Sequence, residues 1–197
     1  TSAVTNFRAL FRRQTNFNDD ISQWDTSRVT SMAAMFEEAY SFDQDLSGWD
    51  TSNVVSMSAM FADAASFTGT QGGSSMAHWN VEKVTRMDRM FQNAILFQGD
   101  LSHWRTVQVH HVADMFHNAI NYKGGQDLAR WETGEFRDLT GMFQHAIRFD
   151  GNISKWNTSN ALEMDEMFHN AISFSGDISL WDTSKVVTFA RMFRNAT

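Results

Sequence analysis

The stretch "NVVSMSAMFADAASF" (Asn53–Phe67) organises this chain, because close copies of it recur from one end to the other. Its large apolar residues are Met57, Met60, Phe61 and Phe67, and small or polar residues separate them. A set of methionines and aromatics is typical of a packed interior, and also of an adaptable binding surface. Recurrence at a regular spacing, with polar residues between, favours the interior.

The 197-residue chain is built from a repeat of about 25 residues. Seven tryptophans mark it, with spacings of 25, 30, 25, 27, 25 and 25 residues. A Met-Phe pair follows the same intervals, from Met35-Phe36 to Met192-Phe193, and Leu10-Phe11 is a degenerate eighth copy. The two longer spacings hold insertions near 68–75 and 123–127, and insertions at one place in a repeat indicate an outer loop. We therefore expect one solenoid of about eight repeats over 1–197.

Each unit predicts a short helix followed by a very short strand. Apolar residues at i, i+3, i+6, i+7 and i+10 would lie on one helix face, with Ser27 as N-cap. In the segment Asp45–Ser47, polar-apolar-polar alternation predicts a strand with Leu46 facing inward. The helical residues of this unit are Val29, Met32, Met35, Phe36 and Ala39. Stacked units would form methionine and phenylalanine columns about 4.8 Å apart.

The phrases "SFDQDLSGWDTSNVVSMSAMF" (41–61) and "RFDGNISKWNTSNALEMDEMF" (148–168) resemble the BspA-type repeats of bacterial surface lipoproteins and protist surface proteins. The resemblance covers essentially the whole chain. It implies an α/β solenoid, a leucine-rich-repeat-like right-handed superhelix with short parallel strands on one face and short helices on the other. It also implies cell-surface attachment and protein interaction, with no enzymatic residues to transfer.

The composition excludes several classes of function. A net charge of −7 and a pI near 5.4 argue against nucleic acid and anionic membranes as partners, because both normally require a basic surface. Without cysteine the chain has no disulfide, thiol chemistry or zinc-thiolate site. No apolar run reaches the roughly 18 to 20 residues of a membrane span, and no leader opens the sequence. These absences leave the compartment undecided.

Two columns of polar residues suggest ligands, and each also has a structural interpretation. Four residues before the tryptophans, stacked carboxylates would bind calcium or cap turns; we prefer the caps. A threonine column would order ice or cap the following helix, and again we prefer caps. The first column is Asp20, Asp45, Ser75, Asp100, Asp127, Asn152 and Asp177, and the second is Thr26, Thr51, Thr106, Thr133, Thr158 and Thr183.

Seven histidines fall in the middle of the chain, and three of them follow the Met-Phe pair in successive units. Those three, His117, His145 and His169, suggest a metal site or a pH-sensitive contact, although we prefer surface polar residues. The others are His78, His103, His110 and His111. None belongs to a nucleophile–base arrangement, so we expect no enzyme, no cofactor and no metal.

The residue before each tryptophan varies between units and is our candidate for partner binding. The column also contains Gly48, and the six candidate side chains are Gln23, His78, His103, Arg130, Lys155 and Leu180. The chain begins and ends in mid-repeat without capping modules, which suggests a fragment of a longer protein or ends that dock on neighbours.

We therefore expect a non-enzymatic scaffold for protein–protein interaction, with an adhesive or structural role at the cell surface or outside the cell. The alternative is an accessory scaffold subunit of a large intracellular complex. A cation-binding module is the remote third interpretation.

Overall fold

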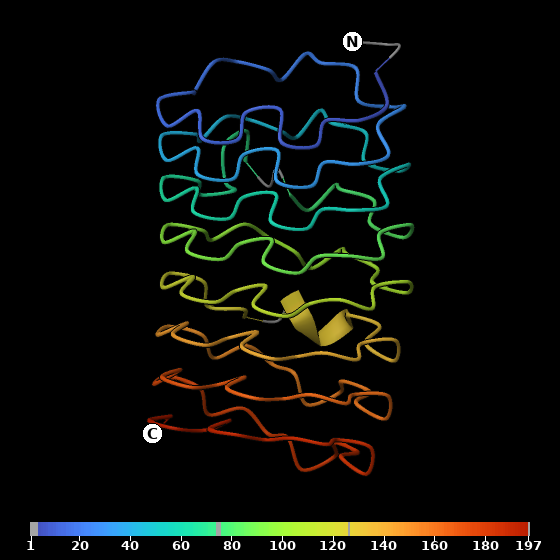
Figure 1. Ribbon diagram of the computed structural model, residues 1–197, viewed down its shortest axis with the longest axis vertical. Coiled ribbons are helices and arrows are strands. Elements are labelled where there is room, and N and C mark those ends of the chain that lie inside the picture. Colours follow the sequence, from blue (N-terminus) through green and yellow to red (C-terminus); the bar gives the residue numbers. More distant parts are fainter. Residues whose placement is uncertain (1–3, 74–75, 126, 197) are drawn as a thin grey trace.

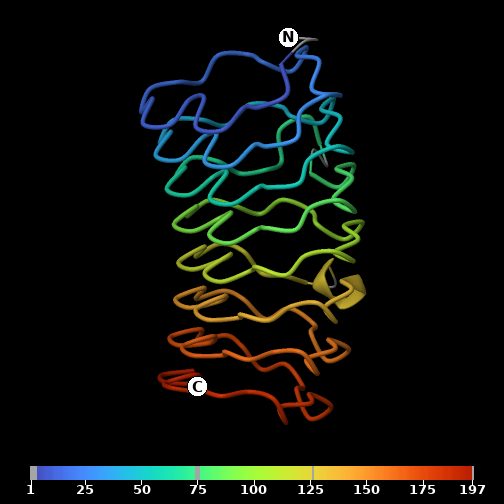
Figure 2. The same cartoon turned by 45° about the vertical axis from the view of Figure 1, so that its right-hand side comes forward.

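The computed structural model describes residues 4–73, 76–125 and 127–196. The chain winds into flattened coils that lie one below another, with the two termini at opposite ends of the stack (Figures 1 and 2). Each coil has two long sides and a narrow tip at either end. Equivalent residues of neighbouring coils are therefore one repeat apart in sequence and adjacent in space.

The predicted α/β solenoid, leucine-rich-repeat-like with helices on one face, is wrong. Within the described residues the one helix is the 3-10 helix η1, Asp127–Arg130, which follows the second insertion. Strand pairing in this part of the chain is limited to isolated parallel bridges between coils. The segment expected to be helical, 29–39, forms turns, and the expected strand at 45–47 is irregular.

Consecutive four-residue turns replace the predicted helix. The N–H of Met35 donates to the carbonyl of Met32 at 3.1 Å, and the N–H of Ala39 to that of Phe36 at 3.0 Å, whereas helical bonds would reach back four residues. The third residue of each turn is left-handed, with φ of 56° at Ala34 and 61° at Glu38, as in type II turns. Because the first and last residues of each turn face inward, M-x-x-M-F-x-x-A has the apolar spacing of a helix without being one.

The N–H groups between these turn bonds join one coil to the next. Met32 donates to the carbonyl of Ser56 at 3.0 Å, and Phe36 donates to that of Met60 at 2.9 Å. The parallel bridges lie in the same segment, and successive bridges link Asn6, Ser31, Ser56, Arg86, His111, Asp138, Glu163 and Thr188 in that order. The contact between coils therefore runs through the segment that was predicted to be helical.

The methionines and phenylalanines fill the interior, so their prediction as core is confirmed. Met35, Met60 and Phe36 have no exposed surface. Phe36 stacks on Phe42 of its own coil with ring centroids 3.8 Å apart, and on Phe61 of the next coil at 5.5 Å. Leu46 is also buried, as predicted. Each inner coil is thus a thin layer whose apolar faces are covered by its two neighbours, whereas Phe189 and Phe193 of the last coil are exposed.

A glycine lies near the start of each insertion for a steric reason. Gly69 and Gly124 have φ of +70° and +75°, and a Cβ would lie 2.7 Å from the ring of Phe97 at the first and 2.5 Å from that of Phe149 at the second. Only glycine combines the left-handed backbone with so close an approach to an aromatic ring.

Candidate interaction surfaces

The predicted partner-binding column lies on the outside of the stack. Each of its members occupies the middle of a turn closed by the tryptophan, such as the bond from the Trp24 N–H to the Ile21 carbonyl at 3.1 Å. Middle residues of such turns point away from the coil. All six predicted residues are exposed, and they are Gln23, His78, His103, Arg130, Lys155 and Leu180. Partner binding at this column stays a prediction.

His78 and His103 are brought together in a shallow hollow of about 340 Å³. Arg105 lies beside them and bridges two carboxylates, Glu82 at 2.9 Å and Glu132 at 3.2 Å. Exposed ion pairs of this kind contribute about 0–1 kcal/mol. The hollow is open, and the charge of Arg105 is already paired with two carboxylates, which makes it a weak candidate for a ligand site.

The aspartate column caps turns, as we preferred. Asp20 accepts the backbone N–H of Ser22 at 2.9 Å, and this bond holds the carboxyl pKa below its ordinary value. Asp177 accepts from Ser179 at 2.9 Å, and its pKa is lowered for the same reason. The same bond is made by Asp45, Asp100 and Asn152. Ser75 and the side chain of Asp127 lie outside the described residues.

The threonine column faces inward and ties one coil to the next. The hydroxyl of Thr51 donates to the carbonyl of Asn80 at 3.0 Å, and that of Thr106 to Glu132 at 2.9 Å. Capping of a following helix is wrong, because turns follow these residues. Ice ordering is wrong as well, because all members of the column but Thr183 are buried. These residues are at most 3% exposed: Thr26, Thr51, Thr106, Thr133 and Thr158.

Three histidines from neighbouring coils form a partly buried cluster. The ring of His145 lies 5.8 Å from that of His117 and 5.4 Å from that of His169, between centroids. His117 contacts Asp114 at 3.2 Å and His169 contacts Glu166 at 3.4 Å. Burial, followed by the two neighbouring histidines, lowers the pKa of His145. All three histidines are half-buried at the surface, and their rings lie beside one another, which the preferred interpretation as separate surface polar residues did not include.

The described residues hold no group of three or more histidine or carboxylate side chains positioned for a metal ion. No helix in the part of the chain that the structure covers is long and apolar enough to cross a membrane.

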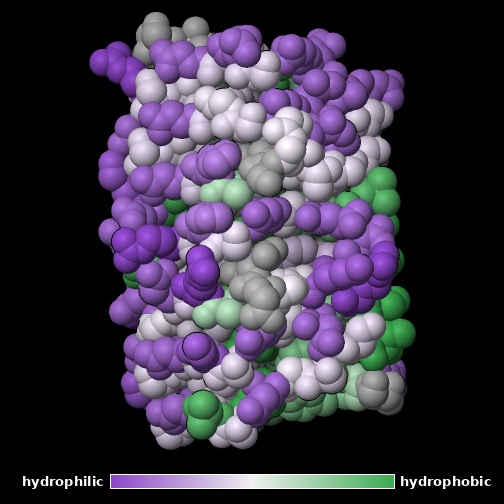
Figure 3. Space-filling view, turned by 180° about the vertical axis from the view of Figure 1, so that it is seen from behind, coloured by the Kyte–Doolittle hydropathy of each residue, from purple (hydrophilic) through white to green (hydrophobic). Residues whose placement is uncertain are grey.

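An exposed apolar ridge runs along one narrow edge of the stack, and sequence analysis missed it. The tip turn of each coil is closed by a bond such as that from the Phe42 N–H to the Ala39 carbonyl at 3.1 Å, so the two residues between point into solvent. In Figure 3 hydrophobic side chains gather along the middle and lower right-hand edge. The exposed members of this apolar ridge are Tyr40 (47%), Leu96 (42%), Ile147 (37%) and Ile172 (48%).

The sequence did carry a sign of the ridge. The residue after the last alanine of the turn segment is isoleucine in four successive units, Ile95, Ile120, Ile147 and Ile172. In a helix, the residue directly after the buried alanine would lie beside the buried face. In the structure the tip turn points this residue into solvent. Because a helix was predicted where the chain forms turns, the apolar ridge was not predicted.

Comparison with known proteins supports a repeat family. The family model described as "Mycoplasma protein of unknown function, DUF285" matches residues 1–75, 70–125 and 121–197. None of the curated proteins matches, and no solved structure does. The prediction of a repeat family of unknown function is confirmed at this level, without distinguishing the BspA type. Since the three matches together span the chain, it belongs to the family of Mycoplasma proteins of unknown function, DUF285.

Proposed function

We propose that this protein is a non-enzymatic scaffold that binds other proteins through its apolar ridge. The observation that carries the proposal is the exposure of Tyr40, Leu96, Ile147 and Ile172 along one edge. Exposed apolar side chains that gather along one edge of a folded protein are typical of interaction sites. The side chains of the interior columns, by contrast, are buried against those of neighbouring coils and cannot contact a partner.

The geometry of the ridge suits a linear partner. Parallel backbone pairing sets neighbouring coils about 4.8 Å apart, so the isoleucines of consecutive coils form a straight apolar line. Aliphatic side chains in such a line offer contact area without hydrogen-bonding demands. An apolar face of a helix or an extended segment would fit this surface, and the variable column before the tryptophans would add polar contacts that differ from coil to coil.

The cell surface, or the space outside the cell, is the location that we propose. The resemblance of the repeats to BspA-type units of surface lipoproteins supports this location. The alternative is a scaffold subunit within a large intracellular complex, which would use the same ridge. The identity and location of the partner distinguish these two possibilities.

A cross-linking experiment in the native source tests the proposal. The double variant Ile147→Ser/Ile172→Ser removes the C-terminal half of the ridge. Leu162→Ser/Val187→Ser is the matched control, because Leu162 and Val187 are 42% and 82% exposed elsewhere. We expect cross-linking mass spectrometry to recover a defined partner with the parent chain and the control, and to lose it with the ridge variant. Equal recovery with all three proteins, or no partner with the parent, would contradict binding through the ridge.

A further inference from the structure

A second surface, on a different part of the stack, collects arginines around a hollow of about 480 Å³. We call it the arginine hollow. The first and fourth coils contribute its basic residues, Arg8 and Arg12 from one and Arg86 and Arg89 from the other. The two coils between them contribute mainly alanine and serine. Small side chains therefore form the bottom of the hollow, and arginine side chains border it on two opposite sides.

The floor follows from the turn geometry. Ala33 and Ala34 are the middle residues of one turn, and Ser58 and Ala59 occupy the same places in the next coil. Middle residues of these turns point outward, so large side chains there project from the surface and small ones leave it recessed. Small residues in two successive coils therefore leave a depression that the arginines of the outer coils border.

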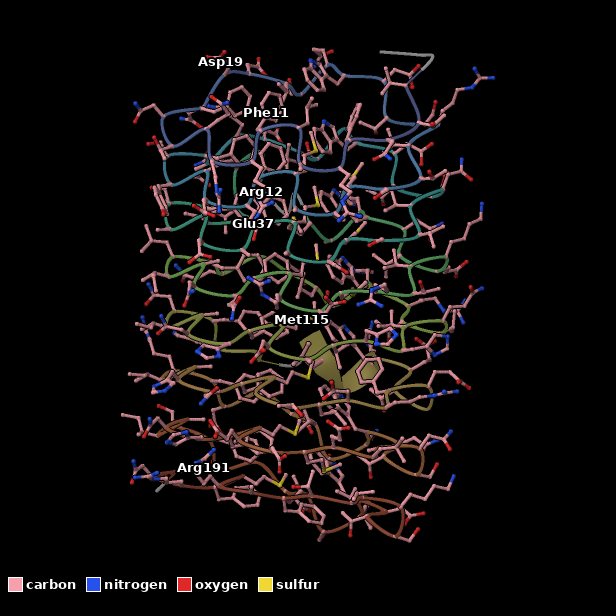
Figure 4. All side chains as sticks on the ribbon, in the orientation of Figure 1. Phe11, Arg12, Asp19, Glu37, Met115 and Arg191 are labelled. Carbon is pink, nitrogen blue, oxygen red and sulfur yellow. The ribbon has the colours of Figure 1, made fainter. Side chains whose placement is uncertain are left out.

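Glu37 lies between two of the arginines and binds one of them closely. Its side chain is only 10% exposed, and it lies 2.8 Å from Nε of Arg12 and 3.8 Å from a terminal nitrogen of Arg89. Figure 4 shows Arg12 and Glu37 close together on the same face. A nearly buried carboxylate requires such partners, since an unpaired buried charge is costly. Glu37 thus orients the guanidinium of Arg12, whereas the Nε of Arg89, three coil spacings away, donates to Oε1 of Gln92 at 2.6 Å.

The hollow retains unused donors and positive charge. A guanidinium has five N–H donors; Arg86 uses one on Asp88 at 3.1 Å. Within the described residues the side chain of Arg8 has no hydrogen bond or ion pair. Four arginines against Glu37 and Asp88 leave two positive charges in excess, on a chain whose net charge is −7. This local reversal of sign favours an anionic ligand.

We propose that the arginine hollow binds an acidic segment of a peptide chain. Arg8 and Arg86, the two arginines that do not contact Glu37, lie three coil spacings apart, or about 14 Å. An extended peptide advances about 3.3 Å per residue, so carboxylates about four residues apart reach both. The small side chains between leave room for its backbone. This surface is separate from the apolar ridge, and the inference stands without it.

A titration of the 197-residue chain tests the site. The probe is the end-blocked peptide Glu-Ser-Ser-Ser-Glu, and its glutamine analogue is the neutral control. We expect calorimetry to detect the acidic peptide and not the neutral one, with affinity falling as salt increases. Arg8→Gln/Arg86→Gln should weaken binding by roughly tenfold or more, since charge-assisted hydrogen bonds are lost at both ends.

A charge-matched variant separates a site from general attraction. Arg137→Gln/Arg148→Gln makes the same change in net charge at exposed positions outside the hollow, and we expect its affinity to stay within about twofold of the parent. Equal weakening by both double variants, equal binding of the neutral peptide, or no binding by the parent would overturn the proposal. Inorganic phosphate that binds as tightly as the peptide would overturn the choice of a peptide.

Discussion

The indole N–H of Trp49 donates to the backbone carbonyl of Ile21, in the preceding coil, at 3.2 Å. That carbonyl also accepts the N–H of Trp24 at 3.1 Å, so one oxygen closes a turn within its coil and binds the next coil. The bond recurs at Trp79, Trp104, Trp131, Trp156 and Trp181. The tryptophan column is therefore a polar link between coils as well as an apolar stack.

Replacing a single tryptophan by phenylalanine should reveal the polar part of this link. Trp104→Phe keeps an aromatic ring in the stack and removes the 2.8 Å bond to the Met76 carbonyl. The backbone N–H of Trp79 still donates to the Met76 carbonyl, so that oxygen keeps one partner. We therefore expect the lost bond to lower the free energy of unfolding by about 1 kcal/mol, and the smaller ring to lower it by about the same amount through poorer packing. Denaturant unfolding measures it.

Trp24→Phe is the control for this prediction, because within the described residues the Trp24 indole has no preceding coil to bind. We expect it to cost less than Trp104→Phe. Equal costs at the two positions would contradict a stabilising role for the indole bond.

The buried threonines should tolerate valine poorly. Thr106→Val preserves shape but removes the 2.9 Å bond to the Glu132 carbonyl, and losing a buried bond costs about 1–3 kcal/mol. Thr183→Val, at an exposed member of the same column, should change the free energy of unfolding by less than about 0.5 kcal/mol. Thermal or denaturant unfolding compares them, and a Thr106 variant as stable as the parent would show that the hydroxyl does not join the coils.

Two neighbouring alanines distinguish turns from a helix. Ala34 has φ of 56°, where an L-residue is strained by about 1–2 kcal/mol, so Ala34→Gly should stabilise the protein by a few tenths to about 1 kcal/mol. Ala33→Gly lies at an ordinary φ and should destabilise it by about 0.5–1 kcal/mol. The measurement is the free energy of unfolding of both variants. Comparable destabilisation by both would indicate a helix and contradict the turns.

The histidine cluster should make stability depend on pH. The pKa of His145 is lowered from its ordinary value of 6.5 by burial and then by His117 and His169, with Glu166 opposing them. The unfolded chain therefore binds more protons, so the stabilisation is complete above the unfolded pKa and decreases as the pH falls from 6.5 toward the folded value.

His145→Asn removes this titration and suits the backbone, because asparagine occupies the same left-handed position at Asn118 and Asn170. We expect the variant to lose less stability than the parent between about pH 7.5 and about pH 5.5. The free energy of unfolding at the two pH values provides the test. Equal losses in parent and variant would show that protonation of His145 is not coupled to folding.

The burial pattern could be predicted from the sequence, and the local backbone could not. Met32, Met35 and Phe36 are buried as predicted, because apolar spacing reports which residues share a face. The same spacing arises from a helix and from consecutive turns whose end residues face inward. Only the hydrogen-bond partners separate the two structures, and these depend on the neighbouring coil.

One column in the sequence does favour turns over a helix. The third residue of the second turn is Asn93, Asn118, Asn170 or Asn195 in four coils, and Gly141 takes the equivalent place in a first turn. Asparagine and glycine are the residues that most readily adopt positive φ. The aspartate caps were predicted correctly because they depend on local chemistry, an oxygen two residues before a free N–H. The apolar ridge and the arginine hollow depended on turn geometry, so neither was predicted.

The central claim is that backbone bonds between successive coils, made by turn segments, hold every apolar column inside and leave only outward residues free to bind partners. Scalar coupling across hydrogen bonds, measured by NMR on the isotope-labelled chain, tests it most directly. We predict a coupling between the amide nitrogen of Phe116 and the carbonyl carbon of Met142, which the structure places in a 2.9 Å hydrogen bond. A coupling from Phe116 to Val112, four residues earlier as in a helix, would contradict the account.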